Sequence, residues 1–421
     1  MPRIALCLAA ALLSSHLSAV EPREVAGEVA AAIEREYFDP GRGARIAAGL
    51  RAEADRGEFD GLRNPLELAT ALTSALKPHD RHFNVRWTAA NDGPSPGVRP
   101  AATAQRQESS NFGIRQVQVL PGNVGYLDMR YFADFEFDAP QPPARRAIEA
   151  ALQLLAHVDA LVIDLRDNGG GSPAMVGYLA SAFVEPGSDI YNTFRSRAGT
   201  ESEAPAQAYP APRTRLPLYV LTSGRTGSAA EAFAYTLKNA KRATLVGEAT
   251  GGAANPGRPY RLGDGFSVFV SNGTPVSPVT GGNWEGTGVL PDVETASAGA
   301  LDKALQLALS ALVEQGKGDA ARWSLEALVS GSAPVPPSTL AELAGDYGAV
   351  RLKRVADALQ LRQDRRPPLR LRLLSADLFF VDGEPTRRVR IAREVDGRVA
   401  ALEVLGAEGQ VARHPRSVAT H

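Results

Sequence analysis

The sequence predicts an α/β protein with a small N-terminal helical domain, an α/β core around a central sheet, and a small C-terminal antiparallel β-domain. Three patterns carry this prediction: helical periodicity near the N-terminus, short apolar runs alternating with helical segments in the middle, and strand-like alternation between turns near the C-terminus. The predicted boundaries are 1–19 for a signal peptide, 20–95 for the helical domain, 96–315 for the core, 316–337 for a linker and 338–415 for the β-domain.

The N-terminal region is rich in Ala, Glu, Arg and Leu. Apolar residues such as Val25, Val29 and Ile33 recur every fourth position, as on one face of a helix. The polar, Pro- and Ala-rich stretch 89–109 then interrupts this periodicity and is typical of a loop.

The core is predicted from buried strands that alternate with helices. The apolar runs lie at 124–127, 160–165, 218–221 and 244–247, and the helical segments at 142–157, 173–183, 228–239 and 300–313. Such alternation is typical of a largely buried sheet covered by helices.

The C-terminal region follows a Gly-, Ser- and Pro-rich stretch. Its runs alternate apolar and basic residues, and the dipeptides Asp382-Gly383 and Asp396-Gly397 are hairpin signals. An accessory antiparallel β-domain is therefore expected.

The composition is that of an ordinary globular protein. The 421 residues are 44% hydrophobic and 22% charged, with a formal net charge of -1, so nucleic acid is not an expected partner. The sequence specifies no oligomeric state.

The first 19 residues have the pattern of a secretory signal: one Arg, an apolar run over 4–13, and small residues ending at Ala19. The run is too short for a spanning helix, so an exported chain, periplasmic or secreted, is expected, with no integral membrane segment after cleavage. The one cysteine, Cys7, lies in this segment, so the mature chain would hold no disulfide and no cysteine-ligated metal.

Ser228 is the first candidate for chemistry. It follows the apolar run 217–222 and opens a helical segment, where the backbone N–H groups of a first turn can hold an oxyanion. Ser-x-x-Glu, completed by Glu231, is equally a helix-capping box, and both interpretations remain open on these residues.

A glycine loop, Asn168 to Gly171, also follows a buried strand and precedes a helix. It has neither the P-loop ending nor the spacing of a dinucleotide fingerprint, so no nucleotide cofactor is expected. Two such turns should meet at one edge of the sheet, where ligands of α/β proteins collect.

Few histidines can serve as a base. His79 and His82 flank Asp80, but their spacing without a third clear ligand is a weak metal signal, and no metal is predicted. His157 ends a predicted helix, where a role toward the helix dipole or solvent is commoner.

Several motifs occur in order along the chain. They are Asn111-Phe112-Gly113-Ile114, Leu120 to Leu127, Ile163 to Arg166 with Asn168 to Gly171, Thr226 to Glu231, Gly247 to Pro256, and Asn283 to Asp292. Together, over about residues 24–315, they resemble the interphotoreceptor retinoid-binding protein repeat, a relative of the tricorn core and the C-terminal processing peptidases. The resemblance implies a crotonase-like core.

The resemblance also implies the site. It makes Ser228 the nucleophile, His82 the general base and Glu285 the supporting carboxylate, with the backbone N–H groups of Ala229 and Gly170 as oxyanion hole. A neutral serine needs such a base, and the base needs an acceptor that fixes its tautomer.

The sequence departs from the related families at three places. Residue 253 is Ala where the processing peptidases have the lysine of a Ser/Lys dyad. Arg81 stands where tricorn has a relay serine next to the histidine, so either Asp80 or Glu285 can orient His82. Only about 30 residues separate Phe83 from Phe112, too few for a PDZ domain.

The expected function is that of an exported serine peptidase-like hydrolase that cleaves peptide or other acyl bonds through a Ser/His/Glu acyl-enzyme mechanism. The alternative from another class is a non-catalytic binding module for retinoid-like or fatty-acyl ligands, since vertebrate relatives with this core are carriers. A third hypothesis is an inactive scaffold in which Ser228 only caps its helix. The full set of Ser228, His82 and Glu285 favours the enzyme.

Overall fold

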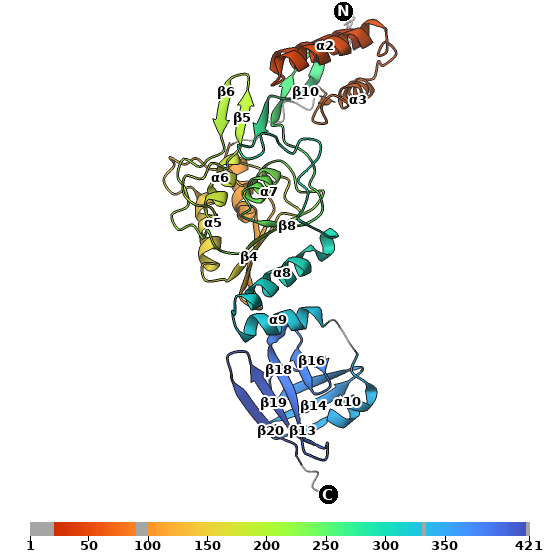
Figure 1. The fold of residues 1–421 in the computed structure, drawn as a ribbon. Helices are drawn as coiled ribbons and strands as arrows, with labels where there is room; N and C mark the ends of the chain where they lie inside the picture. The colour runs from red at the N-terminus through yellow and green to blue at the C-terminus, as the bar shows by residue number, and fades with distance from the viewer. Residues whose placement is uncertain (1–20, 90–99, 331–333, 418–421) are drawn as a thin grey trace, which may run out of the picture. The chain divides into compact units, whose positions relative to one another are not determined.

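The computed structural model describes residues 21–89, 100–330 and 334–417, and it confirms the α/β class (Figure 1). The signal peptide predicted at 1–19 lies outside the described residues. The chain divides into two compact units. The first contains the N-terminal region, residues 195–199 and residues 255–274; the second contains the rest.

The first unit joins three helices to a three-stranded antiparallel sheet of order β1-β10-β9. Its elements are α1 (Pro22–Glu36), α2 (Pro40–Asp55), α3 (Pro65–Leu76), β1 (Asn84–Trp87), β9 (Gly257–Arg261) and β10 (Phe266–Ser271). The predicted helical domain therefore also includes a hairpin from residues 257–271. This pairing buries Val268 and Phe266 against Val85 and the helices, and the sequence pattern did not indicate it.

Local signals explain where these helices begin. Each starts with a proline, which suits the first helical position because it needs no N–H partner there. Asp39 and Asn64 cap the second and third helices by accepting backbone N–H bonds. The buried face is aliphatic, with Val29, Ile33 and Leu72 fully enclosed, as the four-residue periodicity predicted.

The second unit is built on a six-stranded sheet of order β12-β8-β7-β4-β3-β2. All neighbouring pairs are parallel except β2 with β3. The strands are β2 (Ile114–Leu120), β3 (Val124–Met129), β4 (Ala160–Asp164), β7 (Leu218–Thr222), β8 (Thr244–Gly247) and β12 (Val293–Glu294). The helices are α4 (Pro100–Ser109), α5 (Pro143–Leu154), α6 (Pro173–Ser181), α7 (Ala229–Asn239), α8 (Ala300–Glu314) and α9 (Asp319–Val329).

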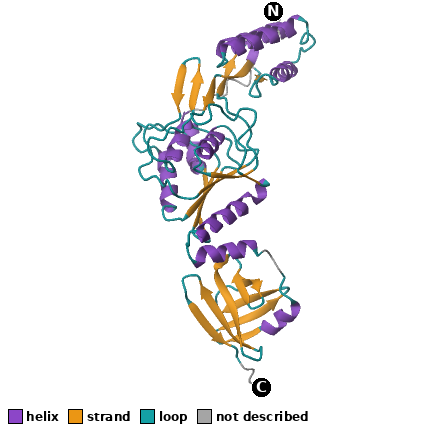
Figure 2. Ribbon diagram, viewed as in Figure 1, coloured by secondary structure: helices purple, strands orange, loops and turns teal. Residues whose placement is uncertain are grey.

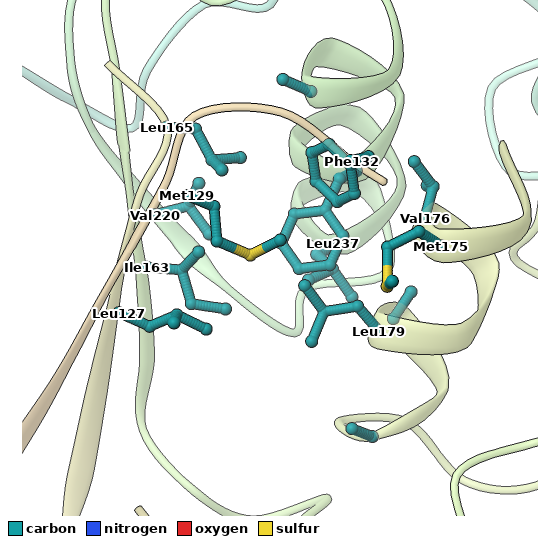
Figure 3. Packing of buried hydrophobic residues seen from close by; sticks show 14 of the residues in the cluster. Leu127, Met129, Phe132, Ile163, Leu165, Met175, Val176, Leu179, Val220 and Leu237 are labelled. Atoms are coloured by element: carbon teal, nitrogen blue, oxygen red, sulfur yellow. The ribbon is translucent and has the colours of Figure 1, made fainter. Parts of the chain in front are cut away.

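Both faces of this sheet are covered, which is why its strands are continuous apolar runs. Leu127, Ile163 and Val220 pack against one set of helices, together with Leu237 of α7 and Leu179 of α6 (Figure 3). The alternate strand residues, such as Tyr126 and Val162, belong to the cluster under α8, which contains Ala304, Ala308 and Leu312.

A further small sheet, of order β11-β5-β6, consists of β5 (Thr193–Ser196), β6 (Gly199–Ser202) and β11 (Gly273–Val276). Its residues are divided between the two units.

The C-terminal part of the second unit is almost entirely strand (Figure 2). After α10 (Pro337–Leu343), eight antiparallel strands follow in chain order. They are β13 (Gly345–Tyr347), β14 (Val350–Val355), β15 (Ala358–Gln363), β16 (Leu369–Ser375), β17 (Leu378–Val381), β18 (Glu384–Arg393), β19 (Val399–Gly406) and β20 (Val411–Pro415). A bridge between Tyr347 and Arg416 joins the last strand to the first. The Gly383 and Gly397 turns have positive φ, as predicted for hairpins.

Residues 316–337, predicted from composition to be a linker, contain a regular helix, α9. Ala321 and Trp323 of this helix are buried, and the Arg388 guanidinium of β18 lies 4.4 Å from the Trp323 ring centroid. These packed side chains explain why the segment is ordered as a helix despite its flanking Gly and Pro residues.

Among residues 21–89, 100–330 and 334–417, no helix has the length and apolar character needed to cross a membrane.

Candidate active site

Ser228 lies between the end of β7 and the start of α7. It is exposed, and its backbone has φ 51° and ψ -121°. Residues other than glycine seldom adopt positive φ, and such strain persists only where surrounding contacts over-determine it, often at functional sites. The predicted capping box is present, with the Glu231 carboxylate accepting the Ser228 N–H, but the Ser228 backbone is not in the extended region that an ordinary helix cap adopts.

The buried carboxylate of Glu231 holds this backbone in place. It accepts the N–H of Ser228 at 2.9 Å and, from a second loop, the N–H groups of Gly252 at 2.6 Å and Ala253 at 2.9 Å. The Thr250 hydroxyl donates to the same carboxylate. One side chain therefore fixes the nucleophile loop to the loop that contains position 253.

The glycine loop after β4 is tied to the loop before Ser228, as the parallel sheet predicted. Ser223 Oγ donates to Arg166 O at 2.5 Å, Thr226 Oγ1 to Leu165 O at 2.8 Å, and the Gly227 N–H to Asn168 O at 3.0 Å. These hydrogen bonds hold the two strand-to-helix turns side by side at the carboxyl edge of the sheet.

Gly170 lies directly against the candidate nucleophile. It has φ 115°, and a Cβ atom placed there would come within 2.7 Å of Ser228 Cβ, so a larger residue cannot be accommodated without a shift. Its N–H donates to Asn168 Oδ1 at 2.9 Å. An oxyanion bound at the Gly170 N–H would therefore have to share or replace the bond to Asn168. Ala229 is the first residue of α7, so its N–H belongs to the first turn, where backbone donors have no partner within the helix.

His82 lies in the first unit, in the turn after α3. Asp80 Oδ1 accepts both the His82 backbone N–H and, at 2.9 Å, the hydrogen of ring nitrogen Nδ1. With Nδ1 as donor, the neutral ring has its acceptor at Nε2, the tautomer required of a base.

Asp80 is well suited to hold this ring, because its side chain is only 2% exposed. Burial by itself would raise the pKa of Asp80, but the hydrogen bonds from the His82 ring and backbone outweigh burial and lower that pKa. The carboxylate is thus ionised and directed at the imidazole.

Glu285 belongs to the same unit as Ser228. Its Oε2 accepts the Ala254 N–H at 2.8 Å, and its own N–H donates to Asn283 Oδ1 at 2.9 Å. Through residue 254, Glu285 is joined to the loop that Glu231 also binds. The carboxylate is therefore anchored to the same loop that Glu231 ties to the candidate nucleophile, Ser228.

Ser228, Gly170 and Ala229 are thus adjacent, and Glu285 is connected to them through the 250–254 loop. His82 and Asp80 form a pair in the other unit. The convergence of Ser228, His82 and Glu285 in one cleft stays a prediction. Sequence reasoning treated Glu231 only as a cap and did not find its bonds to residues 250–253, because they join segments about 20 residues apart.

Residues 123–295 match the model of peptidase family S41. Over 190 residues the chain is 30% identical to the chloroplastic carboxyl-terminal-processing peptidase 1 of Arabidopsis thaliana, covering 44% of this chain and 36% of that protein. It is 31% identical over 154 residues to the carboxyl-terminal-processing protease of a Synechocystis species, covering 36% of this chain and 33% of that protein.

The matched segment thus spans about a third of the length of these curated relatives. Among solved structures, a photosystem II D1 C-terminal processing protease gives a TM-score of 0.44 at 17% identity, covering 66% of this chain and 94% of that one.

Ser228, Gly170 and Glu285 all fall within residues 123–295, the segment that is similar to peptidase family S41.

Proposed function

We propose that the protein is an exported serine peptidase that uses Ser228 as nucleophile and His82 as general base, and that belongs to the tricorn-like branch without a catalytic lysine. The observation that carries the proposal is the strained, exposed Ser228 at the first turn of α7, with Gly170 packed against it. The family match supports serine-type peptidase chemistry.

In this mechanism, His82 Nε2 accepts the proton of the Ser228 hydroxyl while Oγ attacks the carbonyl carbon of the peptide bond. The Ala229 N–H donates to the resulting oxyanion. The protonated imidazole then gives its proton to the leaving amine, and an acyl-enzyme forms. Water, deprotonated by the same imidazole, releases the acid product and restores Ser228.

Asp80 and Glu285 have different roles in this proposal. Asp80 already accepts from Nδ1 of His82, so it is the orienting carboxylate and stabilises the imidazolium. Glu285 fixes the 254 backbone beside the nucleophile loop. Position 253, where Ala replaces the lysine of the processing peptidases, contributes its backbone N–H to Glu231 and no amine.

The substrate is proposed to be a polypeptide cut near its carboxyl end, because both curated relatives described above are named carboxyl-terminal-processing enzymes. A non-catalytic carrier of retinoid-like or fatty-acyl ligands is the alternative, and the following experiment distinguishes it from the enzyme.

A fluorophosphonate probe tests the nucleophile. The wild-type protein should be labelled at Ser228, as mapped by peptide mass spectrometry, and Ser228→Ala should not be labelled. Ser202→Ala, which alters an exposed serine on β6, is the matched control and should label normally. Labelling that persists in Ser228→Ala, or a wild-type protein that binds retinoid or fatty acid but never reacts, would refute the enzyme proposal.

Export is tested separately. The mature protein should begin at about residue 20 when recovered from outside the cytoplasm, as read by N-terminal mass spectrometry. A protein that retains residues 1–19 in the cytoplasm would contradict it.

A further inference from the structure

The outward face of β14, β15 and β16 in the C-terminal sheet is rich in basic side chains (Figure 1). Residues 350–372, which cover β14, β15 and the first part of β16, contain eight basic and two acidic side chains, although the whole chain has a formal net charge of -1. The match to peptidase family S41 ends at residue 295, so neither it nor the proposed catalytic step gives this face a role.

The basic side chains share one face because successive residues of a strand point to opposite sides of the sheet. Leu352 lies opposite Leu361, and both are buried in the apolar cluster of the C-terminal sheet. The neighbouring residues Arg351, Lys353 and Arg362 therefore point to the other side, and all three are exposed.

The basic face continues beyond the strands. Arg365 and Arg366 are exposed in the turn between β15 and β16, next to the end of β15. Val355, the last residue of β14, is on the same side of its strand as Lys353 and is 38% exposed. An exposed apolar side chain thus lies beside the cations.

These cations differ from the other arginines of the C-terminal sheet in their ion pairs. Elsewhere in that sheet the arginines are held by carboxylates: Arg388 by Glu326, Arg390 and Arg413 by Glu403, Arg393 by Glu342 and Asp377, and Arg398 by Asp396. Within the part of the chain that the structure describes, Lys353, Arg362 and Arg365 have no ion-pair partner. Their charge is therefore available to a partner in solution.

Two further cations of the face are compensated in part. Asp346 accepts two bonds from Arg351, and the exposed carboxylate of Asp357 lies 3.7 Å from Arg370. The uncompensated charge is thus concentrated on Lys353, on Arg362 and on the turn that follows β15.

The position of Arg362 opposes folding. It lies directly opposite Arg351 in the antiparallel register, and like charges in that position destabilise a sheet. Sequences that break such a local rule do so mainly where function requires it. Arg362 is therefore better explained by an external anion than by the stability of the sheet.

The chemistry of the face favours a lipid surface as that anion. Neighbouring cations on a sheet are about 5–7 Å apart, so they can each meet a separate anionic group instead of converging on one phosphate. Residues 350–372 contain no aromatic side chain on which a nucleic-acid base could stack. An exposed apolar residue such as Val355 can enter the boundary between headgroups and acyl chains. The secretory pattern at 1–19 also predicts a chain that meets a membrane.

From these observations we propose that the outward face of β14 and β15 docks the protein reversibly on a membrane surface rich in anionic phospholipids, through Lys353, Arg362 and Arg365. Each basic residue near such a surface strengthens binding by about fivefold, so three of them strengthen it by about a hundredfold. This inference goes beyond the proposed peptidase activity and does not depend on it.

Vesicle sedimentation tests the proposal. The chain from residue 20 is used, because the apolar run 4–13 would bind lipid by itself. The protein should sediment with vesicles of phosphatidylglycerol and phosphatidylcholine in about equal amounts, and not with phosphatidylcholine alone. Binding should weaken as sodium chloride is added, because salt screens the attraction. Inorganic phosphate should displace the protein no more than chloride does at the same ionic strength.

Substitutions locate the docking face. The triple variant Lys353→Gln, Arg362→Gln, Arg365→Gln should bind the anionic vesicles about a hundredfold more weakly than wild type. The double variant Arg362→Lys, Arg365→Lys keeps both charges and should bind as wild type does, because the attraction depends on charge and not on the guanidinium geometry.

A matched control removes the same number of charges from exposed, paired arginines outside this face: Arg56→Gln, Arg322→Gln and Arg398→Gln. This variant should bind within about twofold of wild type, since its carboxylate partners already offset those charges. If both triple variants lose binding equally, the attraction follows the net charge and the docking face is wrong. Equal binding to neutral vesicles, or binding to double-stranded RNA without binding to anionic vesicles, would also overturn the proposal.

Discussion

Glu231 accepts the backbone N–H of Ser228 at 2.9 Å, and the same buried carboxylate accepts the N–H of Ala253 at 2.9 Å. One side chain therefore holds the candidate nucleophile and position 253, where the resemblance implies that a catalytic lysine is missing. The carboxylate organises the backbone of both segments.

Replacing Glu231 with Ala should lower the free energy of unfolding by on the order of 3 kcal/mol or more, because several buried donors lose their acceptor. Glu231→Gln should cost less, since it retains one carbonyl oxygen. Urea unfolding measures both. Glu67→Ala, at an exposed glutamate of α3, should change stability by about 0.5 kcal/mol or less. Equal effects of Glu231→Ala and Glu67→Ala would show that the network is not structural.

His82→Ala should reduce kcat/KM by about 10²–10⁴-fold while the protein remains folded, because the proposed mechanism has the His82 ring take the Ser228 proton. Ala253→Lys should not restore the rate. His79→Ala is the matched control, since its exposed ring can be removed while its backbone carbonyl still accepts from Arg42. Near-wild-type turnover by His82→Ala, on a substrate whose hydrolysis needs Ser228, would mean that another group is the base.

Asp80→Asn should lower kcat by at least about a hundredfold with little change in KM, because a neutral amide cannot stabilise the imidazolium that forms at His82. Steady-state kinetics on the same peptide separate the two constants. If the kcat of Asp80→Asn were unchanged, Glu285 rather than Asp80 would be the residue that orients His82. Glu285→Gln would then be expected to show the loss of kcat.

Glu203 should make the protein less stable as pH rises. Its carboxyl is fully buried, and burial raises the pKa of Glu203 to about 7 against the opposing bond from Asn192. The pKa of Glu203 is thus higher in the folded chain than in the unfolded chain. The contribution of Glu203 to the free energy of unfolding is therefore fully present below pH about 4.5 and is lost as pH rises through about 7.

Glu203→Gln removes this titration. Relative to wild type, the variant should therefore gain roughly 2–3 kcal/mol of unfolding free energy between pH 4.5 and pH 8, as 1.36 kcal/mol per pKa unit implies. Urea unfolding at both pH values gives the difference, and Glu201→Gln, at an exposed glutamate of β6, should show none. A pH-independent difference for Glu203→Gln would contradict a raised pKa.

A chain ending at residue 330 should be more soluble and melt at a higher temperature than one ending at residue 317. The shorter chain loses α9, whose Ala321 is part of the cluster with Leu309 and Leu312 of α8. Thermal melting and size-exclusion chromatography compare the two fragments. A soluble, equally stable 317 fragment would show that α9 belongs energetically to the C-terminal β-strands, where Trp323 meets Arg388.

Much of the fold follows from local patterns. The apolar runs around Ile163 and Val220 predicted a buried parallel sheet, and parallel strands bring their carboxyl ends to one edge, so the contact of Gly170 with Ser228 was predictable. The sequence also offered Asp80 as one of two carboxylates that could orient His82, because the two residues are only two positions apart. The structure shows the Asp80–His82 bond.

The sequence by itself determined the α/β class, the two strand-to-helix turns and the candidate nucleophile, because each depends on burial periodicity or on residues adjacent in the chain. Only the tertiary structure decided that β9 and β10 pair with β1 and that Glu231 binds the loop at Ala253. These contacts join segments far apart along the chain. Their partners are selected by the packing of the whole unit, and no local propensity distinguishes them from other pairings of the same residue types.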